Sequence, residues 1–179
     1  MNIINVPSRE EVGQDSQVIF DQIKKTMGKV PNLYATIGYS SHALKGLLGL
    51  EEELNKGIFT AKEKEAINLV VSEANHCDYC LAAHTMIAGM KGISKEDILS
   101  FRKGSVDDPR LNAILELAKS VSEQKGEAAQ DKIENFLAAG FDNSAVMELI
   151  GLVILRTFTN YAFAVTKIPV DFPLADQLD

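Results

Sequence analysis

The chain has few of the features that mark proteins bound to nucleic acid, inserted in a membrane or exported. Its net charge is −7, and its lysines and arginines form no cluster, which argues against nucleic acid and anionic membranes as main partners. The N-terminal stretch MNIINVPSREEVGQ lacks an apolar signal core, and the sequence contains no run of 18 apolar residues. These absences predict a cytoplasmic protein that works without a membrane or nucleic acid.

Strand signals are also scarce. No hairpin turns separate alternating apolar and polar residues, whereas helix caps and stops recur along the chain. The β-branched run from Ile67 to Val71 could form a strand, but the helix signals around it favour a helix. A length of 179 residues is ordinary for one domain and allows a sizeable core. The sequence therefore predicts a single all-α domain spanning residues 1–179.

Capping residues and glycines divide the chain into successive helices. Thr60 with Glu63 has the spacing of a capping box, Ser94 with Asp97 repeats this spacing, and Gly28 follows the predicted last turn of a helix. The predicted helices cover 10–27, 41–55, 60 to a break at 75–76, 77–91, a short segment opened by residue 94, 108–124, 128–139 and 143–166. Residues 30–32 are predicted to form a turn, and the tail 168–173 is predicted to be extended because of its two prolines.

The long last helix is unusually apolar. Residues 149–155 are apolar almost all round, which is typical of a helix buried centrally or at a subunit interface. The helix offers more apolar surface than a small domain readily covers, so we expect self-association.

The segment from Asn75 to His84 contains both cysteines and two of the three histidines. Their order is C-x-x-C followed by x-x-x-H. On a helix, Cys77, Cys80 and His84 would share one face, because residues three and four apart are neighbours. A thiolate is the nucleophilic form of cysteine, and a nearby base or a helix N-terminus lowers the thiol pKa. The spacing therefore favours a thiol redox unit.

Other uses of these residues remain open on local grounds. Cysteines are often small buried hydrophobic residues. Cys77, Cys80 and His84 could bind zinc together with His76 or a carboxylate, but structural zinc sites usually join two segments and no second ligand pair is present. Covalent haem needs histidine directly after the second cysteine, where Leu81 stands, and a thioredoxin-type motif needs a βαβ frame.

The remaining polar residues near the motif have simpler interpretations. His42 is expected at the surface or as a capping residue near a helix start, and His76 at the start of the motif helix. Tyr79 could line a pocket or donate a hydrogen bond, although packing is the favoured use. Glu65 lies roughly opposite the apolar stripe of its helix, where it would face either solvent or a second packed helix, and the local pattern alone favours a surface carboxylate.

Several segments together resemble a known family. The core of the AhpD-like (alkylhydroperoxidase D-like) branch of the carboxymuconolactone decarboxylase family is similar to residues 60–65, 71–75 and 77–85. Peroxidase-related members of about this length are similar to residues 28–33, 160–161 and 169–173 as well. The resemblance thus covers nearly the whole chain and implies one AhpD-like domain over residues 1–179.

The resemblance implies an all-α fold that assembles into trimers or hexamers. It also implies a thiol-dependent peroxidase or disulfide reductase without a metal, haem or other cofactor. The implied substrate is a hydroperoxide, and the implied electron donor is a dithiol or disulfide-reductase protein of the peroxiredoxin or lipoyl type. The decarboxylases that name the family lack the cysteine pair, which argues against decarboxylation here.

The family's proton relay maps onto four residues of this chain. Glu65, twelve positions before Cys77, matches the relay glutamate, and Cys77, Cys80 and His84 match directly. One position departs from the pattern, because the founding branch has a histidine where this chain has Tyr79, so a step through that histidine cannot be carried over.

The mechanism expected from these residues is a peroxidase cycle. Glu65 polarises His84, which takes the proton from Cys80, and the resulting thiolate attacks the peroxide before Cys77 closes a disulfide. The two cysteine roles could be exchanged, since the first cysteine would lie at a helix N-terminus. A second hypothesis is a non-catalytic redox-sensing or interaction protein whose Cys77–Cys80 disulfide switches assembly.

Overall fold

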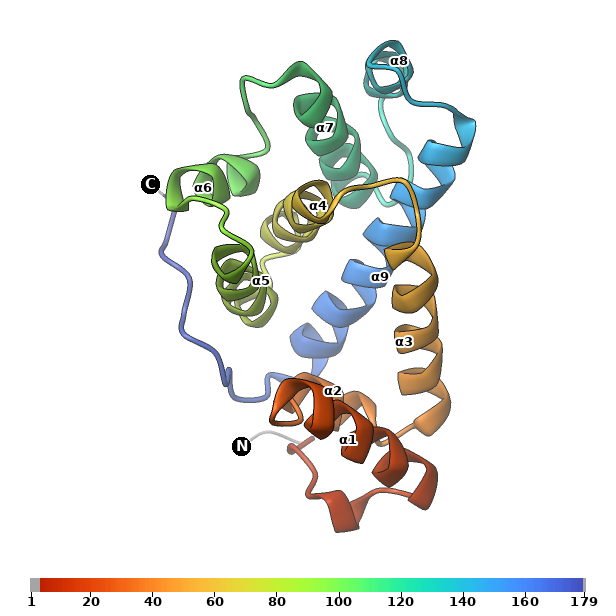
Figure 1. Ribbon diagram of the computed structural model, residues 1–179, viewed down its shortest axis with the longest axis vertical. Helices are drawn as coiled ribbons and strands as arrows, with labels where there is room; N and C mark the ends of the chain where they lie inside the picture. Colours follow the sequence, from red (N-terminus) through yellow and green to blue (C-terminus); the bar gives the residue numbers. More distant parts are fainter. Residues whose placement is uncertain (1–3, 179) are drawn as a thin grey trace.

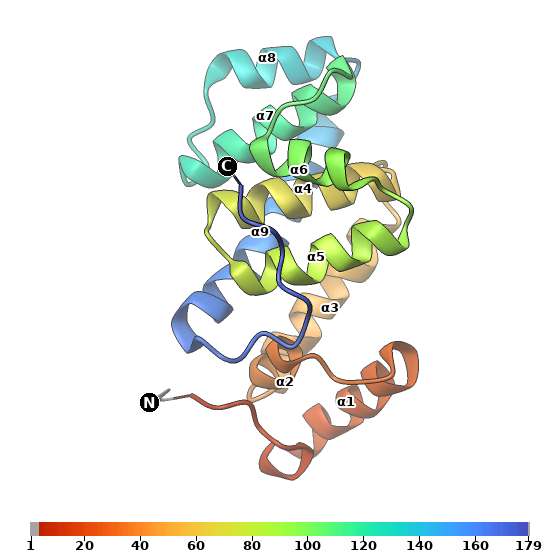
Figure 2. The ribbon, with the colours of Figure 1, turned by 90° about the vertical axis from the view of Figure 1, so that its left-hand side faces the viewer.

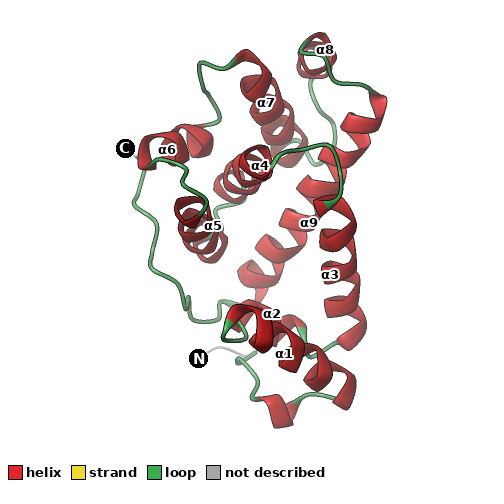
Figure 3. Ribbon diagram, viewed as in Figure 1, coloured by secondary structure: helices red, strands yellow, loops and turns green. Residues whose placement is uncertain are grey.

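The computed structural model describes residues 4–178, and all regular structure in this range is helical (Figure 3), which confirms the predicted fold class. The helices are η1 (Arg9–Glu11), α1 (Gln14–Met27), α2 (Asn32–Ile37), α3 (Ser41–Asn55), α4 (Ala61–Ala74), α5 (Asp78–Met90), α6 (Lys95–Lys103), α7 (Pro109–Glu123), α8 (Gln130–Ala138) and α9 (Asn143–Thr166). The tail after α9 is extended, as its prolines predict.

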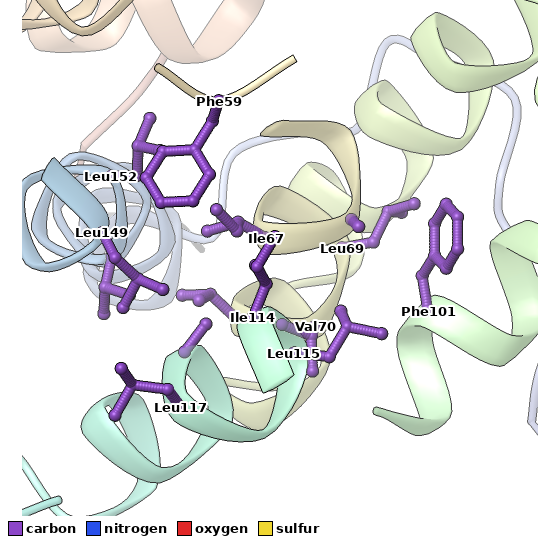
Figure 4. Packing of buried hydrophobic residues seen from close by; sticks show 14 of the residues in the cluster. Phe59, Ile67, Leu69, Val70, Phe101, Ile114, Leu115, Leu117, Leu149 and Leu152 are labelled. Atoms are coloured by element: carbon purple, nitrogen blue, oxygen red, sulfur yellow. The ribbon is translucent and has the colours of Figure 1, made fainter. Parts of the chain in front are cut away.

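Helix α4 lies at the centre of the fold, between α5, α6, α7 and α9 (Figure 1). Its N-terminus is fixed by the predicted capping box, in which Thr60 Oγ1 accepts from Glu63 N and Glu63 Oε2 accepts from Thr60 N. Figure 4 shows Ile67 and Val70 among apolar side chains of α7 and α9. This burial on several sides explains why a β-branched run forms a helix here, since tertiary packing outweighs its intrinsic preference.

The core has two parts, and the cysteine helix lies where they meet. One cluster surrounds α4 and includes Leu81 of α5. The other gathers apolar residues of α1, α2 and α3 with the end of α9, and it includes Cys77, Tyr79 and Cys80. The start of α5 is therefore held between two packed units.

Some predicted boundaries were wrong near the N-terminus. The first helix was expected from residue 10, but a short 3₁₀ turn precedes it and Gly13 is the N-cap of α1. The turn predicted at residues 30–32 instead leads into α2, with Pro31 at its N-cap, because proline suits a helix start as well as a turn. The cap of α3 is Ser40 rather than Ser41, and its hydroxyl accepts from Ala43 N.

Helix α9 has the predicted bounds, but it is not buried all round. Leu149, Leu152 and Leu155 are buried, whereas Ile154 is 55% exposed. The helix is long and apolar enough to span a membrane, but core helices of soluble proteins meet the same criteria. Of its most apolar 18-residue window, 44% is buried within the chain. It also carries the buried polar residue Arg156, which faces the interior of the fold.

The exposed side of α9 carries an apolar stripe, defined by Met147, Ile154, Phe158, Tyr161 and Val165. Their spacing places them along one side of the helix. Replacing both Ile154 and Phe158 with glutamate is expected to lower the mass measured by light scattering at micromolar concentration, because the parent is predicted to self-associate through this stripe. Val18→Glu on α1, which also replaces a half-exposed apolar residue, is the control. A parent that is already monomeric would contradict the prediction.

Candidate active site

The connection between α4 and α5 places the two cysteines. Asn75 ends α4, His76 adopts φ 51° in the left-handed region, and Cys77 becomes the N-cap of α5. Cys77 N donates to Ser72 O at 2.9 Å, so the backbone turns back onto α4 before α5 begins. His76 is exposed and serves the start of the helix, as its position predicts.

The two thiols lie side by side without being bonded. Their Sγ atoms are 2.7 Å apart, and both cysteines are free and buried. Cys77 Sγ also accepts from Cys80 N at 3.3 Å, as an N-cap side chain does. The structure therefore brings Cys77 and Cys80 together, as their spacing predicts, with both thiols free.

The surroundings of the two sulfurs favour ionisation of Cys80. The hydrogen bond from Cys77 lowers the pKa of Cys80 to about 7, with burial opposing the change and the Arg156 charge assisting it. Thr159 and Asn160 act in the same direction. The pKa of Cys77 is raised, first because its thiol donates to Cys80 and also because it is buried.

Glu65 is buried rather than exposed, which corrects the local interpretation of its helix pattern. Only 3% of the residue is accessible, because α5 covers this side of α4. Its Oε2 lies 2.7 Å from His84 Nδ1, and its Oε1 accepts from Lys91 Nζ at 2.6 Å. The residue that the family resemblance matched to the relay therefore contacts His84 directly.

The charge balance around this carboxylate leaves His84 able to accept a proton. Burial raises the pKa of Glu65, but His84 and Lys91 more than offset it, and the pKa falls to about 2. Burial lowers the pKa of His84, and Arg156 adds to this change against the opposing effect of Glu65. The imidazole is thus neutral at neutral pH, with its Nδ1 proton assigned to the bond with the ionised Glu65. Its Nε2 lone pair then remains free.

A cavity of about 300 Å³ opens beside Cys80. Its apolar walls come mainly from α1, α2 and α3, with Leu33 and Leu48 among them, and Phe172 of the tail also lines it. Its polar end holds Cys80 and His84, whereas Cys77 is not among the lining residues. A small apolar molecule with one polar reactive group fits this division of the cavity.

A second, more polar cavity of about 170 Å³ also borders His84. It is lined by Glu65, Lys91 and Lys64 among others, and it shares His84 and Arg156 with the cavity at Cys80. Protons could therefore enter or leave through the polar side while substrate occupies the apolar side.

Tyr79 does more than the packing favoured by the sequence. It packs against Phe163 and Phe172, and its hydroxyl donates to Asp171 Oδ1 at 2.6 Å and accepts from Leu33 N at 3.1 Å. The tail that carries Asp171 crosses α5 (Figure 2). Tyr79 thus ties the tail and α2 to the cysteine helix instead of taking the place of a relay histidine.

We expect Tyr79→Phe to lower the free energy of unfolding by about 1–3 kcal/mol, because Asp171 and Leu33 N each lose a buried hydrogen-bond partner. Urea denaturation followed by circular dichroism measures the change. Tyr161→Phe removes a hydroxyl from a half-exposed tyrosine and should leave stability unchanged. Equal stability of Tyr79→Phe and the parent would contradict the prediction.

The structure also places the other histidines of the chain. His42 is exposed on the first turn of α3, as expected of a surface residue. Among residues 4–178, no group of three or more His, Cys, Asp and Glu side chains is arranged to hold a metal ion. His76, the fourth ligand considered for zinc, points to the exposed surface rather than joining the buried pair.

Sequence reasoning missed one residue of this site. Arg156 on α9 lines both cavities and is 7% exposed. The available signal was that Arg156 is the one basic residue of this largely apolar helix, since Arg is rarely buried unless it is paired.

Comparison with known proteins identifies the central part of this fold. Residues 42–120 match the model of the carboxymuconolactone decarboxylase family, which confirms the resemblance found in the sequence. No curated protein matches the chain.

Several crystal structures share its fold. The alkylhydroperoxidase AhpD core of an uncharacterized peroxidase-related protein from Ralstonia eutropha JMP134 has a TM-score of 0.81 and 20% identity over 93% of this chain and 90% of that chain. An uncharacterized peroxidase-related protein from Silicibacter sp. TM1040 has a TM-score of 0.79 and 19% identity over 99% and 93%. The debrominase Bmp8 in its apo form has a TM-score of 0.79 and 17% identity over 94% and 92%. At these identities the similarity establishes the fold alone.

Proposed function

Because residues 42–120 match the carboxymuconolactone decarboxylase family and the described chain has the AhpD core fold, we propose that this protein is a thiol-dependent peroxidase or disulfide reductase. It reduces hydroperoxides with electrons from a dithiol partner. The observation that carries the proposal is the placement of Cys80: its sulfur lies 2.7 Å from Cys77 Sγ, and the residue lines an apolar cavity together with His84.

The first half of the cycle oxidises Cys80. Neutral His84 accepts the Cys80 proton on Nε2, and Glu65 stabilises the imidazolium through Nδ1. The thiolate attacks the terminal oxygen of ROOH, which forms an S–O bond and breaks the O–O bond. Cys80 becomes a sulfenic acid, and the leaving alkoxide takes the proton from His84 to give ROH.

The second half regenerates the thiols. Cys77 attacks the sulfenic sulfur, forms the Cys77–Cys80 disulfide and releases water. An external dithiol then reduces this disulfide through a mixed disulfide and is itself oxidised. We infer that the donor is a protein of the peroxiredoxin or lipoyl type and that the cycle runs in the cytoplasm, where reduced dithiols are maintained.

Peroxide consumption tests the proposal. Purified protein is mixed with cumene hydroperoxide and dithiothreitol, and peroxide loss is followed over many equivalents per chain. Sustained turnover that exceeds the rate with dithiothreitol alone is expected. Consumption that stops at one equivalent per chain would instead favour the redox-sensing alternative, in which the disulfide only switches assembly.

A further inference from the structure

Arg156 carries a buried positive charge without an acidic partner. Its Nε donates to Asn68 Oδ1 at 3.1 Å and its Nη1 to Thr159 Oγ1 at 3.2 Å, both neutral acceptors. None of the ion pairs within 4.0 Å formed by the described residues includes it. By contrast Arg102, which is 5% exposed, pairs with Glu73 at 2.7 Å. A buried charge is costly unless an opposite charge compensates it, so Arg156 lacks the anion that its position requires.

Cys80 is the group placed to supply that anion. Thr159 Oγ1, which accepts from Arg156 Nη1, lies 3.8 Å from Cys80 Sγ, so one hydroxyl links the guanidinium to the thiol. Arg156 and Cys80 line the same cavity, which Cys77 does not line. The arginine therefore faces the reactive end of the cavity.

Glu51 and Glu65 are the carboxylates that border the two cavities. Glu65 is bound to Lys91 and His84, whereas Glu51 accepts from the neutral Tyr34 hydroxyl at 3.3 Å and forms no ion pair within 4.0 Å with Arg156. The titratable and charged groups that border the two cavities are Tyr34, Glu51, Lys64, Glu65, Tyr79, Cys80, His84, Lys91 and Arg156. Lys64 donates to Asn55 O at 3.0 Å and does not line the cavity at Cys80. Arg156 is thus the permanent cation next to the thiol.

We propose that Arg156 stabilises the thiolate of Cys80 once its proton has left and then stabilises the negative charge that passes to the leaving oxygen of the peroxide. This inference rests on the proposed function only for its second part. A guanidinium remains charged at every working pH, so it acts whether or not His84 is protonated. When the S–O bond forms and the O–O bond breaks, the charge moves from sulfur to oxygen within the same cavity, and the preformed cation requires no rearrangement.

The test compares the ionisation of Cys80 in Arg156→Met and in the parent. The rate of Cys80 alkylation by iodoacetamide is measured from pH 5 to 10, with the modified cysteine identified by mass spectrometry. The midpoint is expected to rise by at least about one pH unit in Arg156→Met, which lowers the thiolate fraction at pH 7 from about one half to about one tenth or less. Arg156→Lys should show a smaller rise of the midpoint, because lysine keeps the positive charge but lacks the planar set of hydrogen-bond donors of a guanidinium.

Arg102→Met is the matched control, since it removes another buried arginine that pairs with Glu73 and lines neither the cavity at Cys80 nor the polar cavity. It should lower thermal stability without moving the alkylation midpoint. If Arg156→Met fails to fold, Thr159→Val removes the linking hydroxyl and should raise the midpoint in the same direction. An unchanged midpoint in the folded Arg156 variant, or in Thr159→Val when it alone folds, would overturn the inference.

The outcomes separate this inference from the proposed function. If the parent turns over peroxide and Arg156→Met has the same alkylation midpoint and rate, the peroxidase function stands. The proposed role of Arg156 would then be wrong. If the parent consumes no peroxide but Arg156→Met still shifts the midpoint, Arg156 remains the partner of the thiolate. The peroxidase function and the second part of the inference would then be wrong.

Discussion

Cys80→Ser is expected to lower the rate of peroxide consumption at least about a thousandfold, because a serine hydroxyl cannot replace the thiolate that attacks the peroxide. Cys77→Ser should also end sustained turnover, but for another reason. It should still consume about one equivalent of peroxide per chain and leave Cys80 as a sulfenic acid, since the resolving thiol is missing. The two variants therefore fail at different steps of the cycle.

Stopped-flow measurement of peroxide loss and trapping of the sulfenic acid with dimedone distinguish these steps. In the parent, the rate of the first step should rise with pH through about pH 7, following the lowered pKa of Cys80, and then level off. If dimedone labels Cys77 in Cys80→Ser but does not label Cys80 in Cys77→Ser, then Cys77 is the cysteine that attacks the peroxide. That result would support the exchanged roles that the helix N-terminus suggested.

Local sequence signals predicted most of the fold because they act over a few residues. The capping box at Thr60 and the cap at Ser94 fix helix starts through side-chain hydrogen bonds within one turn, and both are observed. Short helix α2 was missed because proline before asparagine is equally typical of a turn. The exposure of Ile154 was also missed, since hydrophobicity alone does not tell which side of an apolar helix has a neighbour.

The candidate site was predictable to the extent that its residues are close in sequence. Cys77, Cys80 and His84 belong to one helix start, so their spacing alone indicated a shared face. The burial of Glu65 depends on α5 covering α4, a contact between helices that the pattern of α4 does not encode, and only the family resemblance indicated its role. Arg156 lies on α9, 72 positions after His84, so no local motif joins it to the cysteines.

Glu65→Gln is expected to lower the rate of Cys80 alkylation at neutral pH about tenfold or more, while the protein remains folded. The carboxylate holds His84 Nδ1 at 2.7 Å and stabilises the imidazolium that forms when the thiol proton is taken. Glutamine keeps the size and a hydrogen bond but removes the charge. The sequence pattern alone predicts little change in stability, whereas the buried contacts to His84 and Lys91 predict a loss of about 1–3 kcal/mol.

The pH dependence of stability gives this prediction an independent check. The pKa of Glu65 is about 2 in the folded protein, below its ordinary value of 4.5, so ionised Glu65 stabilises the fold above about pH 4.5. This contribution is lost as pH falls towards 2, and the difference in unfolding free energy between parent and Glu65→Gln should shrink over that range. Glu63→Gln is the control on the same helix, because it loses the pairing with Arg110 but does not touch His84. If Glu65→Gln and Glu63→Gln both alkylate at the parental rate, Glu65 has no part in the relay, and the reactive unit consists of Cys77, Cys80 and His84.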